Sequence, residues 1–213
     1  SGCAVGDYDN DGDADLYLTN YGPNKLYRNT DGVFTEVSTE AGVGGPEWTP
    51  PKWSMGAAFA DVDNDGDLDL FVANFTAFDP DTPPPPPTDE SPCRLKGVPI
   101  ICAPDFFDGQ QDLLYLNNGD GTFGDVSSTA GIHQDEPGRG FAVVFSDYDD
   151  DGDQDLYVAN DSGPNFYYVN KGNGTFADIS WESGAVVNEH GEAEGSMGLT
   201  VGDYNNDGRL DIF

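Results

Sequence analysis

The feature that most constrains this chain is a nine-residue acidic segment that occurs four times. The copies begin at Asp7, Asp61, Asp147 and Asp203 and read DYDNDGDAD, DVDNDGDLD, DYDDDGDQD and DYNNDGRLD. Small residues precede each copy, and an apolar run follows it. Because the acidic segment recurs with the same flanking pattern, the chain is predicted to be built from similar units, each of which buries its apolar surface against its neighbours.

Each complete unit is predicted to contain four short strands. The first strand precedes the acidic segment and the second follows it, while glycine-rich turns join the third to the fourth. The expected strands cover 2–6, 56–60, 142–146 and 198–202, then 16–19, 70–73, 156–159 and 212–213, then 26–28, 114–116 and 167–169, with fourth strands starting at 34, 123 and 176. No segment has helical periodicity. The small residues of the first strands predict close backbone packing, as on a crowded inner strand.

The predicted fold class is therefore all-β: a β-propeller segment of four-stranded antiparallel blades, with the acidic segments as loops between the first and second strands. Residues 1–213 form one such segment, with repeats that start near residues 2, 56, 141 and 198. This gives three blades and a partial fourth. A partial fourth blade leaves the ring of blades open, so we expect a segment of a longer protein or a subunit completed by neighbours.

The second repeat carries an insertion over residues 75–111. It contains five consecutive prolines, 83–87, which predict a polyproline II spacer. Cys93 and Cys102 enclose eight residues and are expected to form a small disulfide in an oxidising compartment. Two interpretations of the insertion stay open: a site of specific recognition, or a covering flap. Cys3 aligns with Ala57 on an inner strand, which predicts a buried free thiol.

Charge excludes several classes of partner. The chain has 40 Asp and Glu against 8 Lys and Arg, a formal net charge of −32. Such a chain repels phosphate backbones and anionic lipid, so we expect no nucleic acid partner, and the lack of a long apolar run predicts no membrane insertion. Cations are the expected partners. Disorder is opposed by a composition that is 37% hydrophobic and 12% aromatic.

The spacing within each acidic segment is typical of a metal-binding loop. Side chains at positions 1, 3, 5 and 9 of a curled loop converge, the glycine at position 6 allows the turn, and position 7 offers its backbone carbonyl whatever its side chain. A flexible ring of carboxylates favours Ca²⁺ over Mg²⁺ or Zn²⁺. Position 12 is Leu18, Val72 or Val158 instead of the Glu of an EF-hand, and strands are expected on both sides.

The unit Gly-x-x-x-x-Asp-x-Asp-x-Asp-Gly-x-x-Asp-Leu resembles the FG-GAP/VCBS repeat of integrin-α-type propellers. Segments 93–99, 117–123, 158–166 and 195–203 are similar to the cartilage acidic protein family, secreted proteins that usually carry a C-terminal ASPIC/UnbV domain. The resemblance covers nearly the whole chain, although no ASPIC/UnbV domain is recognisable in it. It implies a Ca²⁺-loaded propeller, with seven blades in the family, that acts in adhesion or extracellular binding without an established catalytic activity.

By motif position, the resemblance implies up to four Ca²⁺ sites. Their ligands would be Asp7, Asp9, Asp11, Asp13 and Asp15; Asp61, Asp63, Asp65, Asp67 and Asp69; Asp147, Asp149, Asp151, Asp153 and Asp155; and Asp203, Asn205, Asp207, Arg209 and Asp211. The fourth site is expected to be the weakest, because Asn205 replaces an acid and Arg209 stands at position 7.

The function predicted is an extracellular calcium-binding β-propeller module for adhesion or for binding a protein or glycan, with structural Ca²⁺ and no catalytic residues. The expected location is the extracellular space or the cell surface, with the periplasm as an alternative. Two other functions stay open. One is a self-assembling subunit of an extracellular fibre, and the other is the propeller scaffold of a polysaccharide-acting enzyme. Trp48, Trp53 and Trp181 are expected between blades, as sugar-stacking rings or structural plugs.

Overall fold

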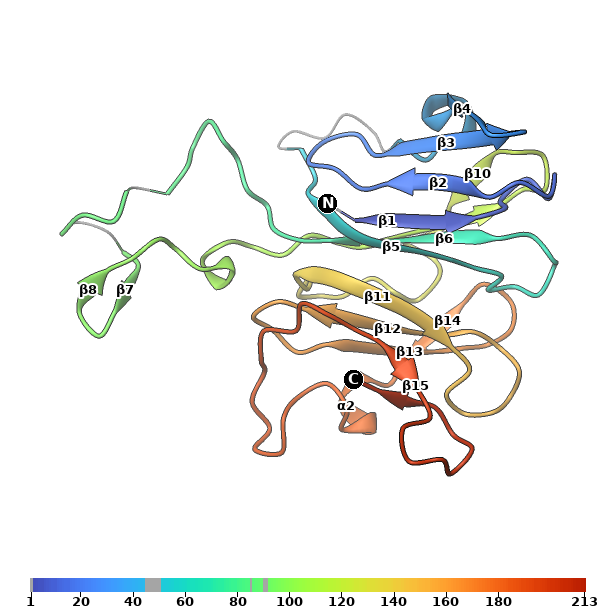
Figure 1. Ribbon diagram of the computed structural model, residues 1–213. Coiled ribbons are helices and arrows are strands. Elements are labelled where there is room, and N and C mark those ends of the chain that lie inside the picture. Colours follow the sequence, from blue (N-terminus) through green and yellow to red (C-terminus); the bar gives the residue numbers. More distant parts are fainter. Residues whose placement is uncertain (1, 45–50, 85, 90–91) are drawn as a thin grey trace.

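Three four-stranded antiparallel sheets stand side by side in the computed structural model, which describes residues 2–44, 51–84, 86–89 and 92–213 (Figure 1). The first sheet contains β1 (Cys3–Gly6), β2 (Asp15–Leu18), β3 (Lys25–Thr30) and β4 (Val33–Glu36); the second contains β5 (Ser54–Ala60), β6 (Asp69–Asn74), β9 (Leu113–Asn117) and β10 (Phe123–Asp125); the third contains β11 (Gly140–Ser146), β12 (Asp155–Asn160), β13 (Phe166–Asn170) and β14 (Phe176–Asp178). The predicted all-β fold of propeller-like blades is confirmed.

A fourth repeat begins at the C-terminal end of the chain. It consists of the two-stranded sheet β15 (Val201–Gly202) and β16 (Asp211–Ile212). The first strand of this repeat is shorter than the predicted 198–202. The two strands flank the fourth acidic loop, as β1 and β2 flank the first.

Two apolar cores lie between neighbouring blades. Leu70 and Val72 of β6 face the first sheet, where they pack with Tyr17 and Leu26. The alternate residue Phe71 faces the third sheet and joins the second core. All six residues of β6 are buried, because a sheet covers both of its faces. The same burial applies to β12, which explains why the second and third repeats carry unbroken apolar runs after their acidic segments.

The first strands of the blades pack against one another, as their small residues predict. A Cβ atom added to Gly56 would lie only 2.9 Å from the backbone carbonyl oxygen of Phe141 in the next blade. Any larger residue at this position would therefore push β5 and β11 apart. Glycine at 56 is required by this close approach of two backbones.

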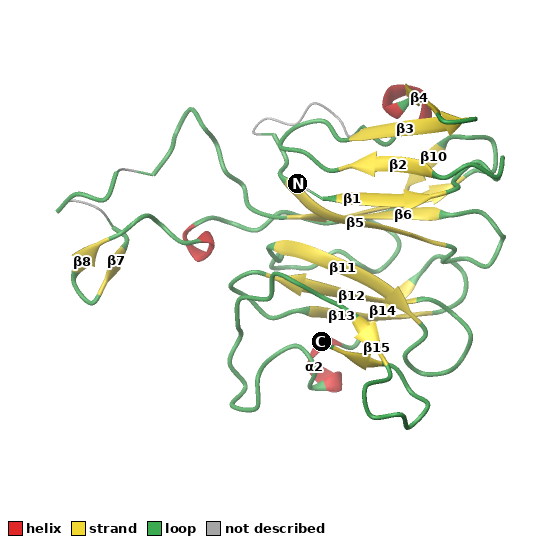
Figure 2. Cartoon of the chain, in the orientation of Figure 1, coloured by secondary structure: helices red, strands yellow, loops and turns green. Residues whose placement is uncertain are grey.

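One prediction about local structure is wrong. Cys3 is free but exposed, because it lies on the face of β1 opposite the buried Ala4, where no described segment packs. Single-turn helices also follow two of the blades: α1 (Ser38–Ala41) and α2 (Ser180–Ser183), drawn in red in Figure 2. A left-handed glycine ends each helix, so they are short turns without the periodicity that a sequence pattern would reveal.

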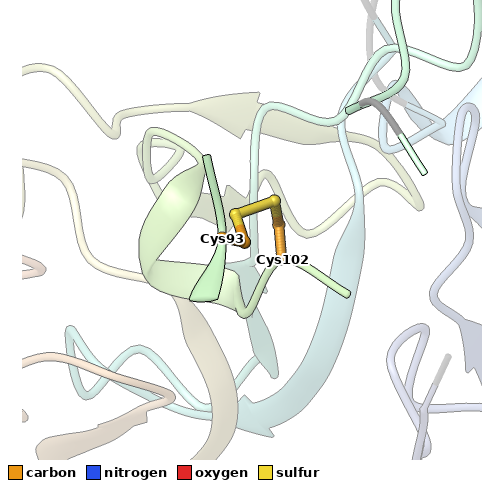
Figure 3. Close-up of a disulfide and its surroundings, with 2 residues drawn as sticks. All are labelled: Cys93 and Cys102. Carbon is orange, nitrogen blue, oxygen red and sulfur yellow. A yellow bond between two sulfur atoms is a disulfide. The ribbon is translucent and has the colours of Figure 1, made fainter. Parts of the chain in front are cut away.

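The segment between β6 and β9 projects from the stacked sheets as a long arm (Figure 1). It contains the hairpin of β7 (Arg94–Leu95) and β8 (Val98–Pro99) and a 3₁₀ turn, Pro104–Phe106. Cys93 and Cys102 form the predicted disulfide at the base of this hairpin, with their Cα atoms 5.1 Å apart (Figure 3). Residue 85 of the predicted proline run lies outside the described residues. Trp48, which is predicted to lie between blades, is also outside them.

Candidate metal centres

The acidic loops share one backbone conformation. In the first loop, the Asp7 carboxylate accepts hydrogen bonds from the amides of Asp11 (3.1 Å) and Gly12 (2.9 Å). Gly12 and Asn10 both have positive φ, 96° and 57°, which is why the loop uses glycine at position 6 and Asn or Asp at position 4. The other three loops repeat these contacts, so the sequence repeat is also a repeat of hydrogen bonds.

Three carboxylates converge in each of the first three loops. Positions 1, 3 and 9 each supply one oxygen, and the three oxygens lie within 4.8 Å of one another. The groups are Asp7, Asp9 and Asp15; Asp61, Asp63 and Asp69; and Asp147, Asp149 and Asp155. Positions 1 and 3 belong to the loop, whereas position 9 is the first residue of the second strand, which the sheet holds in place.

The aspartate at position 9 is the most constrained member of each group. In the second blade, the buried Asp69 accepts hydrogen bonds from the amides of Val62 and Asn117, both at 2.8 Å. Burial is the largest cause that raises the pKa of Asp69 to about 7, against the opposing effect of these two amides. Each oxygen keeps a second lone pair, which a cation can use.

Position 3 supplies the observation that tests whether a metal fits. One oxygen of Asp9 and one of Asp63 are buried without any hydrogen-bond partner among the described residues. Burial, followed by the charge of the position 5 carboxylate, raises the pKa of both groups. A buried acceptor without a donor costs about 1–3 kcal/mol, and a hard cation in the loop would satisfy it. The residues therefore fit a divalent cation with oxygen ligands.

Positions 5 and 7 are arranged differently from positions 1, 3 and 9. The position 5 carboxylate accepts a hydrogen bond from the position 7 amide, at 2.9 Å in all four loops. The position 7 side chain turns outward in the second and third loops. Asp67 accepts a hydrogen bond from the Asn10 amide group (2.6 Å), and Asp153 accepts one from Asn64 (2.8 Å). These two aspartates join neighbouring blades.

The fourth loop lacks the group of three acids, because Asn205 occupies position 3. Asn205 accepts a hydrogen bond from the amide of Asp207 at 2.8 Å, and Asp203 and Asp211 keep the contacts of their counterparts. The position 4 and position 7 residues also change charge between the third and fourth loops. They are Asp150 and Arg209, in the positions that hold Asn and Asp at the two preceding junctions.

The prediction from sequence missed an asparagine at the end of each third strand. The amide group of Asn117 donates to the carbonyl of Tyr8 in the preceding acidic loop (2.8 Å) and to that of Leu68 in its own loop (3.1 Å). Asn170 makes the matching contacts one blade later. The signal was present in the sequence, since Asn29, Asn117 and Asn170 occupy the equivalent position in the three complete repeats. Adjacent acidic loops are thus connected through one side chain.

These blades and loops define a known class of repeat. A family model described as FG-GAP-like repeat matches residues 7–72, 100–158 and 147–213. Because these matches cover well over half of the chain, the chain belongs to the FG-GAP-like repeat family.

The chain is also similar to named relatives. It is 35% identical over 98 residues to cartilage acidic protein 1 of Xenopus tropicalis, which is 46% of this chain and 14% of that protein. It is 35% identical over 91 residues to the Mus musculus protein and 34% identical over 91 residues to the Homo sapiens protein, which is 41% of this chain in both cases and 13% and 12% of those proteins. The matched stretch is therefore a small part of each relative.

Among solved structures, the chain is similar to an Agrocybe aegerita lectin that recognises non-reducing terminal N-acetylglucosamine. The TM-score is 0.43 at 18% identity, and the match covers 98% of this chain and 44% of the lectin. No helix in the described part of the chain is long and apolar enough to cross a membrane.

Proposed function

We propose that this chain is a calcium-stabilised repeat module that binds an extracellular protein or glycan without catalysing a reaction. The observation that carries the proposal is the threefold recurrence of converging carboxylates. Two of these groups include an aspartate, Asp9 or Asp63, with a buried oxygen that has no hydrogen-bond partner among the described residues. Ca²⁺ is the proposed ion, because these ligands are oxygens on a flexible loop and the groups lack the nitrogen or sulfur ligands of zinc.

The ion would supply charge neutralisation. At an effective dielectric constant near 20, two carboxylates about 4 Å apart repel by roughly 4 kcal/mol. Neutralising the loop would fix the start of the second strand. It would also fix the carbonyl of position 2, which the next blade binds through Asn117 or Asn170. The bound ions would therefore stabilise the packing of blades as well as individual loops.

An extracellular location is supported by two findings. The Cys93–Cys102 disulfide is typical of proteins that fold in an oxidising compartment. The named relatives are cartilage acidic proteins. Extracellular Ca²⁺ is abundant enough to fill sites of modest affinity, with dissociation constants of about 10⁻⁴–10⁻³ M.

Calorimetric titration and thermal unfolding test the metal proposal. We expect Ca²⁺ to raise the free energy of unfolding by about 2.7 kcal/mol per site at 100 times the dissociation constant, and Mg²⁺ to be a poor substitute. Asp63→Asn should remove one site. The matched control is Asp120→Asn, which makes the same charge change in an exposed turn where the third blade already has Asn173. Equal Ca²⁺ binding by the two variants, or a melting curve unmoved by chelator, would refute the proposal.

A further inference from the structure

A second candidate site lies away from the acidic loops, where the arm meets the second blade. The structure has a pocket of about 420 Å³ there, between the start of the arm and its returning limb. The rings of Trp53, Phe75, Phe78 and Phe107 line it, with Ile101 and Pro104. Its volume is within the range of small-ligand pockets. None of the carboxylates in the acidic loops lines this pocket, so its role is independent of the metal proposal.

The rings that line the pocket meet nearly at right angles. Trp53 and Phe75 have centroids 5.5 Å apart at an interplanar angle of 89°, and Phe78 and Phe107 are 5.8 Å apart at 73°. Trp53 also contacts Phe78, at 6.1 Å and 60°. Rings in this arrangement turn their faces in different directions around one space. Adjacent walls of an aromatic cage, which surrounds a cation with the negative faces of several rings, meet at such angles.

Hydrogen bonds to backbone groups hold the pocket walls in place. The amide of Phe75 donates to the Trp53 carbonyl (2.7 Å), and the amide of Trp53 donates to the side chain of Gln110 (2.9 Å). On the returning limb, the guanidinium of Arg139 donates to the carbonyls of Pro104 (2.9 Å) and Phe107 (2.7 Å). The cage is therefore largely formed in advance, which lowers the entropic cost of binding.

The electrostatic surroundings favour a positively charged ligand. The arm has six acidic and two basic residues between 75 and 111, in a chain of net charge −32. Asp79 and Asp81 lie close enough to Tyr21, which packs on Trp53 and Phe78, to raise its pKa together with the larger effect of desolvation. No basic side chain is among the described residues that line the pocket.

The lining also argues against sugars and anions. Among the described residues that line the pocket, Thr76 is the one with a hydroxyl group, and it is only 2% exposed. A sugar would leave most of its hydroxyl groups without partners, and an anion would face ring faces and nearby carboxylates. We propose that this pocket binds an organic cation with an apolar surface, such as a quaternary ammonium group, through the rings of Trp53, Phe78 and Phe107.

The test compares two probes of nearly the same shape. Choline carries a trimethylammonium group, and 3,3-dimethylbutan-1-ol carries a neutral tert-butyl group in its place. Titrations followed by calorimetry and by Trp fluorescence are run in saturating Ca²⁺, so that the acidic loops do not compete for the cation. We expect saturable choline binding that is about tenfold tighter than binding of the neutral alcohol, because several ring faces contribute.

Two leucine variants separate the cage from general apolar packing. Phe78→Leu keeps an apolar side chain but removes one ring face, and should weaken choline about three- to tenfold while leaving the weak affinity for the alcohol unchanged. Phe106→Leu is the matched control, because Phe106 packs on Phe107 but does not line the pocket. Circular dichroism and Ca²⁺ binding show whether each variant is folded. Equal affinity for the two probes, no saturable binding, or equal effects of the two variants would overturn the proposal.

Discussion

Asp112 offers a sharp test of how burial controls the stability of these blades. It is the residue before β9, where the other two complete repeats have Asn24 and Asn165. All three side chains accept a hydrogen bond from the backbone amide at the end of the second strand; for Asp112 this donor is Asn74, at 2.7 Å. Asp112 is only 6% exposed. Burial is the largest cause that raises its pKa to about 7, against the opposing effects of the Asn74 amide and Lys52.

The substitution Asp112→Asn should stabilise the protein at alkaline pH. Because the folded pKa is above the unfolded value of 3.8, the folded state holds a proton that the unfolded state releases between about pH 4 and 7. The contribution of Asp112 to stability is therefore fully present below about pH 4 and is lost as the pH rises through 7. The folded and unfolded pKa values of Asp112 differ by about three, so its ionisation can change the free energy of unfolding by at most about 4 kcal/mol.

The expected gain is smaller than this bound. Lys52 is largely desolvated, which lowers its pKa, and it would lose a nearby carboxylate in the variant. We therefore expect Asp112→Asn to be more stable than the parent by about 2 kcal/mol at pH 8 and nearly equal at pH 4. Asparagine keeps the acceptor for the Asn74 amide, as Asn24 and Asn165 do in their blades.

Urea unfolding at pH 8 and pH 4 measures the effect. Free Ca²⁺ is held constant, and the difference between parent and variant cancels the titration of the acidic loops. The matched control is Asn24→Asp, which places a carboxyl group at the equivalent buried position and should destabilise the first blade as the pH rises. A variant that is less stable at pH 8 would mean that an ionised Asp112 is stabilised by Lys52, and the reasoning from burial would be refuted.

Two further predictions concern contacts between segments. Asn117→Ala removes donors to the Tyr8 and Leu68 carbonyls and should lower the free energy of unfolding by about 2–4 kcal/mol, measured in urea; a loss below about 0.5 kcal/mol would contradict a role in joining blades. Arg139→Gln shortens the side chain that binds the returning limb of the arm, and should speed limited proteolysis near residues 104–107 while changing global stability by less than about 1 kcal/mol, because that limb is partly exposed. Unchanged cleavage there would contradict this anchoring role.

Much of the fold could be predicted from the sequence, because the repeat supplied four views of one unit. The apolar runs after each acidic segment correspond to β2, β6 and β12. The small residues before each segment correspond to closely packed inner strands, as the contact at Gly56 shows. Within the candidate metal centres, positions 1, 3, 5 and 9 were expected to converge. In three loops the carboxylates at positions 1, 3 and 9 do, whereas the position 5 carboxylate accepts a hydrogen bond from the position 7 amide.

Other features depend on neighbouring blades and could not be predicted from one unit. The sequence placed Asp67 and Asp153 in the ligand sets through their backbone carbonyls, and it did not predict that their side chains accept hydrogen bonds from the Asn of the preceding loop. Cys3 was expected to be buried by analogy with Ala57, although the two residues have different surroundings. The aromatic pocket was not foreseen, because its rings come from three separate segments around Trp53, Phe75 and Phe107.

The sequence alone determined the repeat, its strands and the loop that can hold a hard cation, because these features depend on local spacing and on the conformational preferences of glycine and asparagine. Only the tertiary structure decided which carboxylates face inward, which join adjacent blades, and where the aromatic rings enclose a space. Those outcomes depend on side chains far apart in the chain that meet only when the blades pack, and no local pattern encodes such meetings.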